Sequence, residues 1–264
     1  MSDSVQTWHY GLVARHWAEH LTTGPEIAFY QRQIETYGQP ALDAGCGTGR
    51  LLLPFLRAGL DVDGCDVSND MLAYCQQTAE REGLAPRLYR QALHNLDLPR
   101  HYQTIVACGV FGIGVSRAQD FAALQRFYQH LVPGGVLLLE NHLPYSDAKV
   151  WPLWRKEART HLPEPWPEDI GQPAGNDHDY ELHYRPVAVD PLEQCAIGEM
   201  RTLLFKDKQL VADDTRRLTS NYYFRYELRM LLEHAGFRVE AEKGDWTEAD
   251  ATTDHAVIVY VARK

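Results

Sequence analysis

The stretch Ala-Leu-Asp-Ala-Gly-Cys-Gly-Thr-Gly at residues 41–49 decides the fold. A short apolar run that ends in a glycine-rich turn is typical of a β-strand leading through a loop into a helix. Glycine adopts positive φ and lets a ligand approach the backbone, and the N–H groups that open a helix favour an anionic group. Asp66, 21 positions after Gly45, closes the next strand-like run. A carboxylate there can accept hydrogen bonds from a ribose diol, so the spacing predicts a pocket for a nucleoside-bearing cofactor.

Short apolar runs alternate with helical patterns over residues 41–141. The runs predict strands at 41–45, 62–67, 87–93, 103–108 and 135–141, with a helix at 118–131 between the last two. Two more strands, at 238–243 and 256–262, would close the chain as a hairpin. Right-handed βαβ units follow from this alternation. We therefore expect an α/β fold, with a Rossmann-like, doubly wound, mostly parallel seven-stranded sheet and a C-terminal antiparallel hairpin.

The flanking segments predict a cap and an insert around one domain, 1–264. Residues 1–40 read as a helical cap that is broken at Gly24-Pro25. Residues 142–177 are rich in proline and tryptophan, and alternating patterns at 180–189, 193–205 and 210–219 predict a small antiparallel β insert. We expect residues 142–221 to form a lid or substrate subdomain, because an irregular segment of this length is usually functional.

The loop chemistry narrows the choice of nucleoside. The nicotinamide fingerprint Gly-x-Gly-x-x-Gly needs a small third residue, but Arg50 stands there. The acidic Asp43 beside the loop would repel a pyrophosphate, whereas it suits an ammonium or a sulfonium. A nicotinamide-dependent oxidoreductase stays open as the alternative.

The segment Asp43-x-Gly45-x-Gly47-x-Gly49 resembles the first motif of the class I S-adenosylmethionine-dependent methyltransferases, and Asp66 resembles the ribose acid of the second. The resemblance continues through Pro133-Gly134-Gly135 and Ala235-Gly236-Phe237, and covers about residues 41–141 and 222–264. The insert is similar to the small sheet of small-molecule N- and O-methyltransferases, sugar N-methyltransferases included. The resemblance implies S-adenosyl-L-methionine as cofactor, S-adenosyl-L-homocysteine as product, and an N or O nucleophile on a small molecule.

The resemblance also implies roles for residues of the pocket. Asp43 would lie near the amino group of the methionine portion and Asp66 would hold the ribose hydroxyls, while Val67 and Met71 would sandwich the adenine. Gln91 stands where the family usually has an Asp, and its amide oxygen could accept from the adenine amino group. The other cofactor-binding positions are Gly45, Cys46, Gly47 and Gly49 in the loop, Ala92 and Leu93 at the adenine edge, and Cys108 and Gly109 on the methionine side.

The sequence contains fewer signals for the residues that would bind the methyl acceptor. His142 follows the fifth strand and could take a proton from the acceptor, although methyl transfer needs a base only when the acceptor must lose a proton. Tyr145, Trp151 and Tyr222 could form walls of the acceptor pocket or simply pack the insert. Trp17 and Tyr30 could cover the cofactor. The histidines lack metal-ligand spacing such as His-Glu-x-x-His, so we expect no metal.

The composition limits which binding partners and which cellular compartment we expect. The formal net charge of −10 disfavours a nucleic acid as partner, since phosphate binding needs a basic surface. No apolar run approaches the roughly 20 residues of a membrane span. The five cysteines include no Cys-x-x-Cys and the start has no signal-peptide pattern, so we expect a cytoplasmic protein with reduced thiols, as a monomer or homodimer. An aminopropyltransferase and a non-catalytic S-adenosylmethionine-binding protein remain alternatives.

Overall fold

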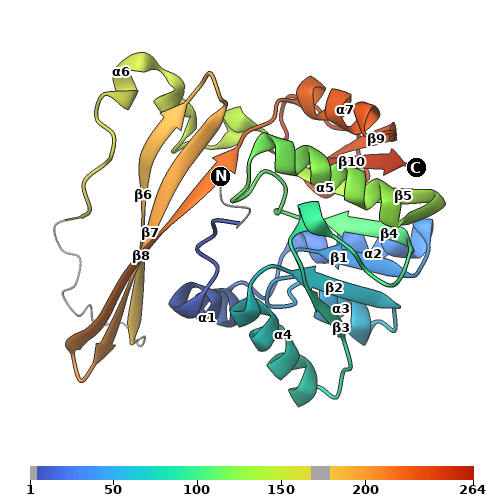
Figure 1. The fold of residues 1–264 in the computed structure, drawn as a ribbon, viewed down its shortest axis with the longest axis horizontal. Helices are drawn as coiled ribbons and strands as arrows, with labels where there is room; N and C mark the ends of the chain where they lie inside the picture. The colour runs from blue at the N-terminus through green and yellow to red at the C-terminus, as the bar shows by residue number, and fades with distance from the viewer. Residues whose placement is uncertain (1–4, 168–178) are drawn as a thin grey trace.

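The computed structural model describes residues 5–167 and 179–264, and its core is a seven-stranded sheet of order β3-β2-β1-β4-β5-β10-β9 (Figure 1). Strands β1 to β5 pair in parallel, and β10 pairs antiparallel with both β5 and β9. The predicted Rossmann-like fold with its C-terminal hairpin is therefore confirmed. The strands are β1 (Ala41–Ala44), β2 (Val62–Asp66), β3 (Arg87–Arg90), β4 (Tyr102–Ala107), β5 (Leu131–His142), β9 (Arg238–Gly244) and β10 (Val257–Arg263).

Helices cover both faces of this sheet because its strand residues alternate between two apolar clusters. Leu42, Ile105 and Leu137 pack with α5 (Arg117–His130) and α7 (Arg225–His234) on one face. The neighbouring strand residues pack on the other face with α2 (Pro25–Tyr37), α3 (Leu52–Arg57) and α4 (Asn69–Arg81). With both faces buried, the strands are almost continuously apolar, as parallel sheets require.

Two predicted boundaries were wrong. The third strand ends at Arg90 rather than at residue 93, and a short 3₁₀ turn, η1 (Leu93–Asn95), follows it. The fifth strand begins at Leu131 rather than at residue 135. Its register jumps from Leu131 opposite Tyr102 to Val136 opposite Thr104, so the proline-glycine turn is an irregularity inside the strand.

The insert forms a separate antiparallel sheet of order β6-β7-β8, with β6 (Tyr180–Asp190), β7 (Cys195–Lys206) and β8 (Gln209–Asn221). Short elements lead into it: η2 (Pro144–Ser146), η3 (Trp151–Trp154) and α6 (Lys156–Arg159). Part of the predicted irregular segment, residues 168–177, lies outside the described residues. Figure 1 shows the insert beside the main domain, with α1 (Gly11–His20) near the space between them. Helix α1 packs against α4 and also contacts β7.

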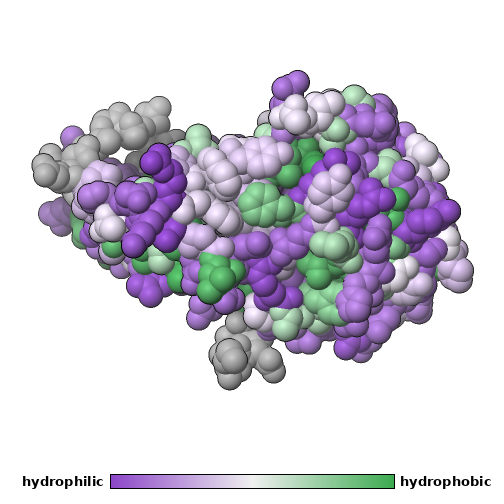
Figure 2. Space-filling view, turned by 90° about the horizontal axis from the view of Figure 1, so that it is seen from above, coloured by the Kyte–Doolittle hydropathy of each residue, from purple (hydrophilic) through white to green (hydrophobic). Residues whose placement is uncertain are grey.

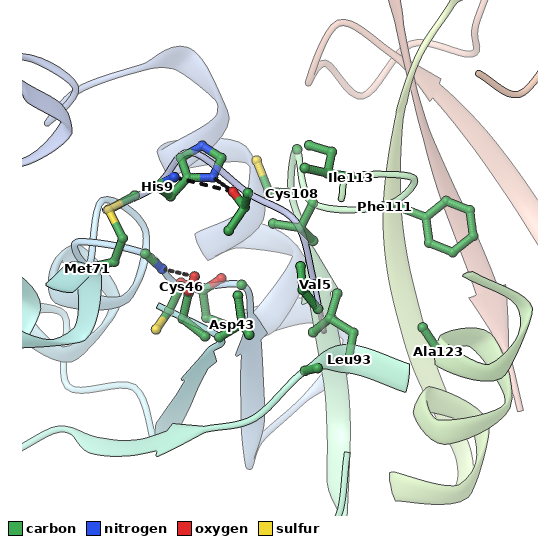
Figure 3. A pocket seen from close by; sticks show the side chains of 18 of the residues that line it. Val5, His9, Asp43, Cys46, Met71, Leu93, Cys108, Phe111, Ile113 and Ala123 are labelled. Carbon is green, nitrogen blue, oxygen red and sulfur yellow. Dashed lines mark hydrogen bonds between the residues drawn. The ribbon is translucent and has the colours of Figure 1, made fainter. Parts of the chain in front are cut away.

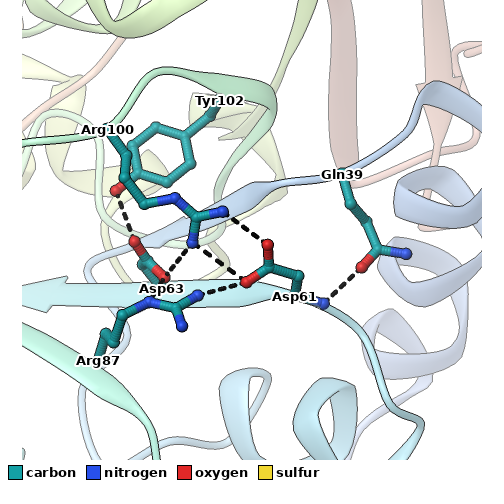
Figure 4. Close-up of polar contacts among 6 residues, drawn as sticks. All are labelled: Gln39, Asp61, Asp63, Arg87, Arg100 and Tyr102. Carbon is teal, nitrogen blue, oxygen red and sulfur yellow. Dashed lines mark hydrogen bonds and ion pairs between the residues drawn. The ribbon is translucent and has the colours of Figure 1, made fainter.

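An ion network around the buried Asp63 lies at the end of the sheet where β2 begins, away from the glycine loop (Figure 4). The Asp63 side chain is fully buried and accepts from Arg87 Nε at 2.6 Å and Arg100 Nη1 at 3.0 Å. The Tyr102 hydroxyl donates to its other oxygen at 3.0 Å. The same two arginines also bind Asp61, and their hydrogen bonds, that of Arg100 first, lower its pKa to about 2. This network joins β2, β3 and the start of β4.

The surface is mostly hydrophilic on the face drawn in Figure 2, with apolar residues scattered among polar ones. No helix in the two described ranges is both long enough and apolar enough to span a bilayer.

Candidate functional site

A pocket opens where β1, β2 and β4 end, the edge at which open parallel sheets bind ligands (Figure 3). The structure brings almost all the predicted cofactor residues to its wall. They are Asp43, Gly45, Cys46, Gly47, Asp66, Val67, Met71, Gln91, Ala92, Leu93, Cys108 and Gly109.

The predicted loop glycine that does not line the pocket is Gly49. Its φ is +90°, and a Cβ at this position would lie 2.7 Å from Cys75 Sγ and 2.8 Å from Leu53 Cγ. Gly49 therefore lets α3 pack closely against α4, which is a packing role rather than a ligand contact. The sequence placed it with the binding residues because a glycine spacing alone does not separate the two roles.

The first loop glycines shape the pocket floor. A Cβ on Gly45, which has a φ of +80°, would come within 2.3 Å of Val110 Cγ1. The Gly47 N–H donates to Asp66 Oδ2 at 3.0 Å, and so ties the loop to the end of β2. Position 45 therefore has no room for a side chain, and the backbone itself forms the wall.

Asp43 carries a buried carboxylate oxygen without a partner. Its side chain projects near the loop in Figure 3, the residue is 2% exposed, and Oδ2 accepts no hydrogen bond in the part of the chain that the structure describes. Burial, followed by the negative charge of Asp66, raises the pKa of Asp43 to about 7. A cationic group in the pocket would pair with this carboxylate where water cannot reach it. It would both satisfy the unpaired oxygen and stabilise the ionised form of Asp43.

Arg50 is not that cation. It lines the pocket, but its guanidinium forms an ion pair with Glu26 at the start of α2. The Glu26 side chain is nearly buried, at 7% exposure. Arg50 thereby joins the cap helix to the glycine loop, a role that its position in the motif did not reveal.

Asp66 has the geometry of an anchored acceptor. Its Oδ1 accepts from the Ser68 N–H at 2.8 Å and its Oδ2 from the Gly47 N–H at 3.0 Å. Burial raises its pKa, while these backbone hydrogen bonds act in the opposite direction. A carboxylate offers about four lone-pair sites, so two remain for further donors such as a diol.

The Gln91 side chain is held by another contact. Its amide nitrogen donates to the Asp97 carbonyl at 2.9 Å, and its amide oxygen accepts from the Asp97 N–H at 2.7 Å. The predicted adenine contact through this oxygen therefore competes with a bond that is already made. Gln91 still lines the pocket, where its side chain fixes the loop after β3.

Sequence reasoning missed the N-terminal arm, residues 5–10, which crosses the pocket (Figure 3). Val5, Thr7 and His9 line it, together with the predicted Trp17 of α1 and with Leu21, which follows that helix. The arm is tied down because the Gln6 N–H donates to Gly114 O at 2.9 Å and Ser68 Oγ donates to His9 O at 2.5 Å. Burial lowers the pKa of His9 to about 4. The sequence analysis read this arm as part of the helical cap at residues 1–40, which was wrong, because the first helix begins at Gly11.

The loop after β4 and the start of α5 supply a second set of missed residues. The pocket lining also includes Phe111, Ile113 and Val115 of the loop and Gln119, Asp120 and Ala123 of α5. Ile113 also forms a β-bridge with Ser220 at the end of β8, so the pocket wall is joined directly to the insert.

The predicted acceptor residues lie outside this lining. His142 Nε2 is 3.0 Å from Glu140 Oε1, and this hydrogen bond raises the His142 pKa. The His142 side chain is 61% exposed. Glu140 reaches the pocket wall through Cys108, whose Sγ lies 3.0 Å from Oε2. The predicted lid residue Tyr30 does not line the pocket either, and its hydroxyl donates to Glu140 at 3.2 Å.

Tyr145, Trp151 and Tyr222 lie in an aromatic group that leads into the insert. Tyr145 and Trp151 are 46% and 38% exposed, and their ring centroids are 6.4 Å apart. Tyr222 meets Trp154 edge to face at 5.9 Å. This group is separate from the pocket wall, although Tyr222 follows Ser220 closely in the chain.

Comparisons with known proteins agree with this geometry. Residues 41–135 match the family model described as a methyltransferase domain. A dTDP-3-amino-3,6-dideoxy-α-D-glucopyranose N,N-dimethyltransferase from Streptomyces fradiae is 34% identical over 117 residues, 44% of this chain and 44% of that protein. The chain spans about half the length, or less, of the first curated relatives it matches.

Solved structures share the fold over almost the whole chain. A S-adenosylmethionine-dependent methyltransferase from Clostridium acetobutylicum superposes with a TM-score of 0.73 at 15% identity, covering 95% of this chain and 96% of that one. An amino pentose methyltransferase from Micromonospora echinaspora gives 0.62 at 18% identity and covers 98% and 99%. Residues 41–135 thus form a methyltransferase domain, and the chain has the fold of the class I S-adenosylmethionine-dependent methyltransferase family.

Proposed function

We propose that the chain is an enzyme that binds S-adenosylmethionine in this pocket and transfers its methyl group to a small-molecule acceptor. The observation that carries the proposal is the unpartnered Oδ2 of Asp43, which is buried beside Gly45, a position without room for a side chain. An amino acid ammonium is the group that such an oxygen lacks. A pyrophosphate would instead meet two carboxylates, the buried Asp43 and the half-buried Asp66.

In this proposal, the residues of the pocket bind and orient the donor. Asp43 pairs with its ammonium, and Asp66 uses its two remaining acceptor sites for the ribose diol. Val67 and Met71 hold the adenine, with Ala92 and Leu93 at its edge. When bound, S-adenosylmethionine would supply an electrophilic methyl group on a sulfonium. The arm at residues 5–10 excludes water from the site, which strengthens each of these electrostatic contacts.

We further propose that residues 1–40 cap the cofactor and that residues 142–221 cover the acceptor. The relatives support a small acceptor, since those from Streptomyces fradiae and Streptomyces venezuelae are both named as N,N-dimethyltransferases of dTDP-linked amino sugars. His142, polarised by Glu140, would accept the proton that the acceptor loses.

Calorimetry tests the binding step. We expect S-adenosylhomocysteine to bind the wild-type chain, and Asp66→Ala to weaken that binding by roughly 1–3 kcal/mol because two hydrogen bonds are lost. The matched control is Glu233→Gln, an exposed acid on α7 that pairs with Arg229. Tight NADH binding without any response to the sulfur nucleosides would overturn the proposal in favour of an oxidoreductase.

A methyl-release assay tests catalysis separately. The panel should contain amines, phenols and carboxylates, with decarboxylated S-adenosylmethionine as a second donor. Binding of the sulfur nucleoside without methyl release to any acceptor would indicate a non-catalytic binding protein. Transfer of an aminopropyl group would indicate an aminopropyltransferase.

A further inference from the structure

The pocket continues beyond the residues that would hold the methyl donor. In the proposed function, Asp43 binds the ammonium and Asp66 binds the ribose, so the sulfonium lies between them, beside the glycine loop. Val110 borders this position, because a Cβ on Gly45 would come within 2.3 Å of Val110 Cγ1. The lining then follows the loop after β4. We call this part of the wall the apolar section and define it by Val5 of the arm and by Val110, Phe111, Ile113 and Val115 of the loop.

The apolar section leads from the sulfonium position to the insert. Ile113 forms its β-bridge with Ser220, at the end of β8. Val5 of the arm packs against the same loop, since a Cβ on Gly114 would lie 3.1 Å from Val5 Cγ1. Figure 3 shows Val5 and Ile113 on the side of the pocket away from Met71. A molecule that reaches the sulfonium from the insert therefore passes between the arm and this loop.

The polar side chains of α5 beside the apolar section already have protein partners. Asp120 Oδ1 accepts from the Gly112 N–H at 3.1 Å. Its Oδ2 accepts from Asn221 Nδ2 and from the Tyr223 hydroxyl, both at 2.7 Å. The Gln119 side chain completes the capping box of α5. A polar acceptor would therefore lose its bonds to water here without gaining replacements, which disfavours its binding.

The charges around the pocket do not suit an anionic acceptor. Among the described residues, Arg50 is the one lysine or arginine in the lining, and it is paired with Glu26. Three acids lie in the same wall, Asp43, Asp66 and Asp120. The segments outside the described ranges contain no lysine or arginine. The arginines of the insert sheet each pair with an acid of that sheet, and they are Arg185, Arg201, Arg216 and Arg217. A diphosphate would thus meet negative charge without a free cation in the described wall.

Resting on the proposed function, we propose that the methyl acceptor binds at the apolar section and is an uncharged, largely apolar molecule. Its apolar body packs against Val5, Phe111 and Ile113. Its nitrogen or oxygen is neutral and so keeps the lone pair that methyl transfer requires. This class differs from the dTDP-linked amino sugars in the names of the Streptomyces relatives.

Two matched pairs of probes test this inference by ligand-observed NMR titration of protein saturated with S-adenosylhomocysteine. Cyclohexanol and myo-inositol share one carbon ring, but inositol has a hydroxyl on every carbon, so we expect cyclohexanol to bind at least about tenfold more tightly. Thymidine and thymidine diphosphate differ only in the diphosphate, and we expect the diphosphate to bind no more tightly. A single hydrogen bond from a free cation would instead favour it at least about tenfold. Inositol binding as tightly as cyclohexanol, or a tenfold preference for the diphosphate, overturns the proposal.

Two variants locate the effect. Ile113→Thr keeps a β-branched side chain and makes the wall more polar, so it should weaken cyclohexanol binding about threefold to tenfold. The control is Ile197→Thr, because Ile197 of β7 is also half-buried but does not line the pocket. Cyclohexanol affinity in this control should stay within about twofold of wild type. Equal affinities in the two variants contradict the inference.

Failure of the inference can be distinguished from failure of the proposed function. Saturation of the wild-type chain with S-adenosylhomocysteine is measured first. If this nucleoside does not bind, the proposed function fails, and the acceptor site fails with it. If it binds but the saturated protein prefers inositol or the diphosphate, the proposed function stands and only the inference about the acceptor is overturned.

Discussion

Asp43 makes cofactor binding depend on pH in a direction that the structure sets. Its pKa of about 7 means that the carboxyl is largely protonated at pH 5 and largely ionised at pH 8. Only the carboxylate attracts an ammonium. The association constant for S-adenosylhomocysteine should therefore fall about tenfold per pH unit below 7, or roughly 50-fold from pH 7 to pH 5, and level off above 7.

Calorimetry over about pH 5 to 8 in two buffers of different ionisation enthalpy measures this dependence. Below pH 7, binding should release about one proton to the buffer. Asp43→Asn should bind weakly with a nearly flat profile. His9 does not mimic the effect, because its pKa of about 4 keeps it neutral across this range. The pKa values of Asp66 and Asp120 in the same wall are also raised, so the comparison with Asp43→Asn is what assigns the pH slope to Asp43. The reasoning is refuted if wild type and Asp43→Asn show the same pH slope.

The same shift predicts an effect on stability without ligand. The folded pKa lies above the unfolded value of 3.8, so between these two values the folded state holds a proton that the unfolded chain has released. Stability must therefore decrease as pH rises from about 4 to about 7 and stay low above, by up to about 4 kcal/mol for a shift of about three units. Urea denaturation of wild type against Asp43→Asn isolates this contribution. Wild type should become less stable than Asp43→Asn as the pH rises. A destabilisation of wild type that grows as the pH falls would contradict the sign.

Three further variants test packing, ion pairing and capping. Gly49→Ala should lower the free energy of unfolding in urea by about 2–4 kcal/mol, because it adds a steric clash to a strained positive φ. Gly59 also has a positive φ but faces open space, so Gly59→Ala should lower it by only about 1–2 kcal/mol. Asp63→Ala should lose about 1–3 kcal/mol, because it removes the buried acceptor of Arg87, Arg100 and Tyr102 while both arginines keep Asp61 as a partner. Breaking the exposed pair in Asp213→Ala should lose about 0–1 kcal/mol, and equal losses would refute the role of burial. Ser68→Ala removes the N-cap of α4, which should lower the free energy of unfolding by about 1–2 kcal/mol. It also removes the hydrogen bond to His9 O that holds the arm, so S-adenosylhomocysteine should dissociate faster in stopped flow. An unchanged dissociation rate would exclude this role of the arm.

Local patterns in the sequence predicted most of the fold. The three strands of the insert start within two residues of their predicted positions, and Gly24-Pro25 breaks the N-terminal helices as expected. Such features depend on side-chain alternation and on the backbone preferences of glycine and proline, which neighbouring residues in the chain determine. The two misplaced boundaries, at Arg90 and Leu131, depend on strand register, which a single segment does not encode.

The sequence by itself determined the cofactor-binding edge. Asp43, the glycines and Asp66 lie at the ends of consecutive parallel strands, and the topology alone brings such ends together. Only the tertiary structure decided that Gly49 packs helices, that Asp97 occupies the Gln91 amide and that Glu26 pairs with Arg50. The same holds for the arm over the pocket. These contacts join residues far apart in the chain, and their partners are chosen by packing in three dimensions rather than by any spacing along the sequence.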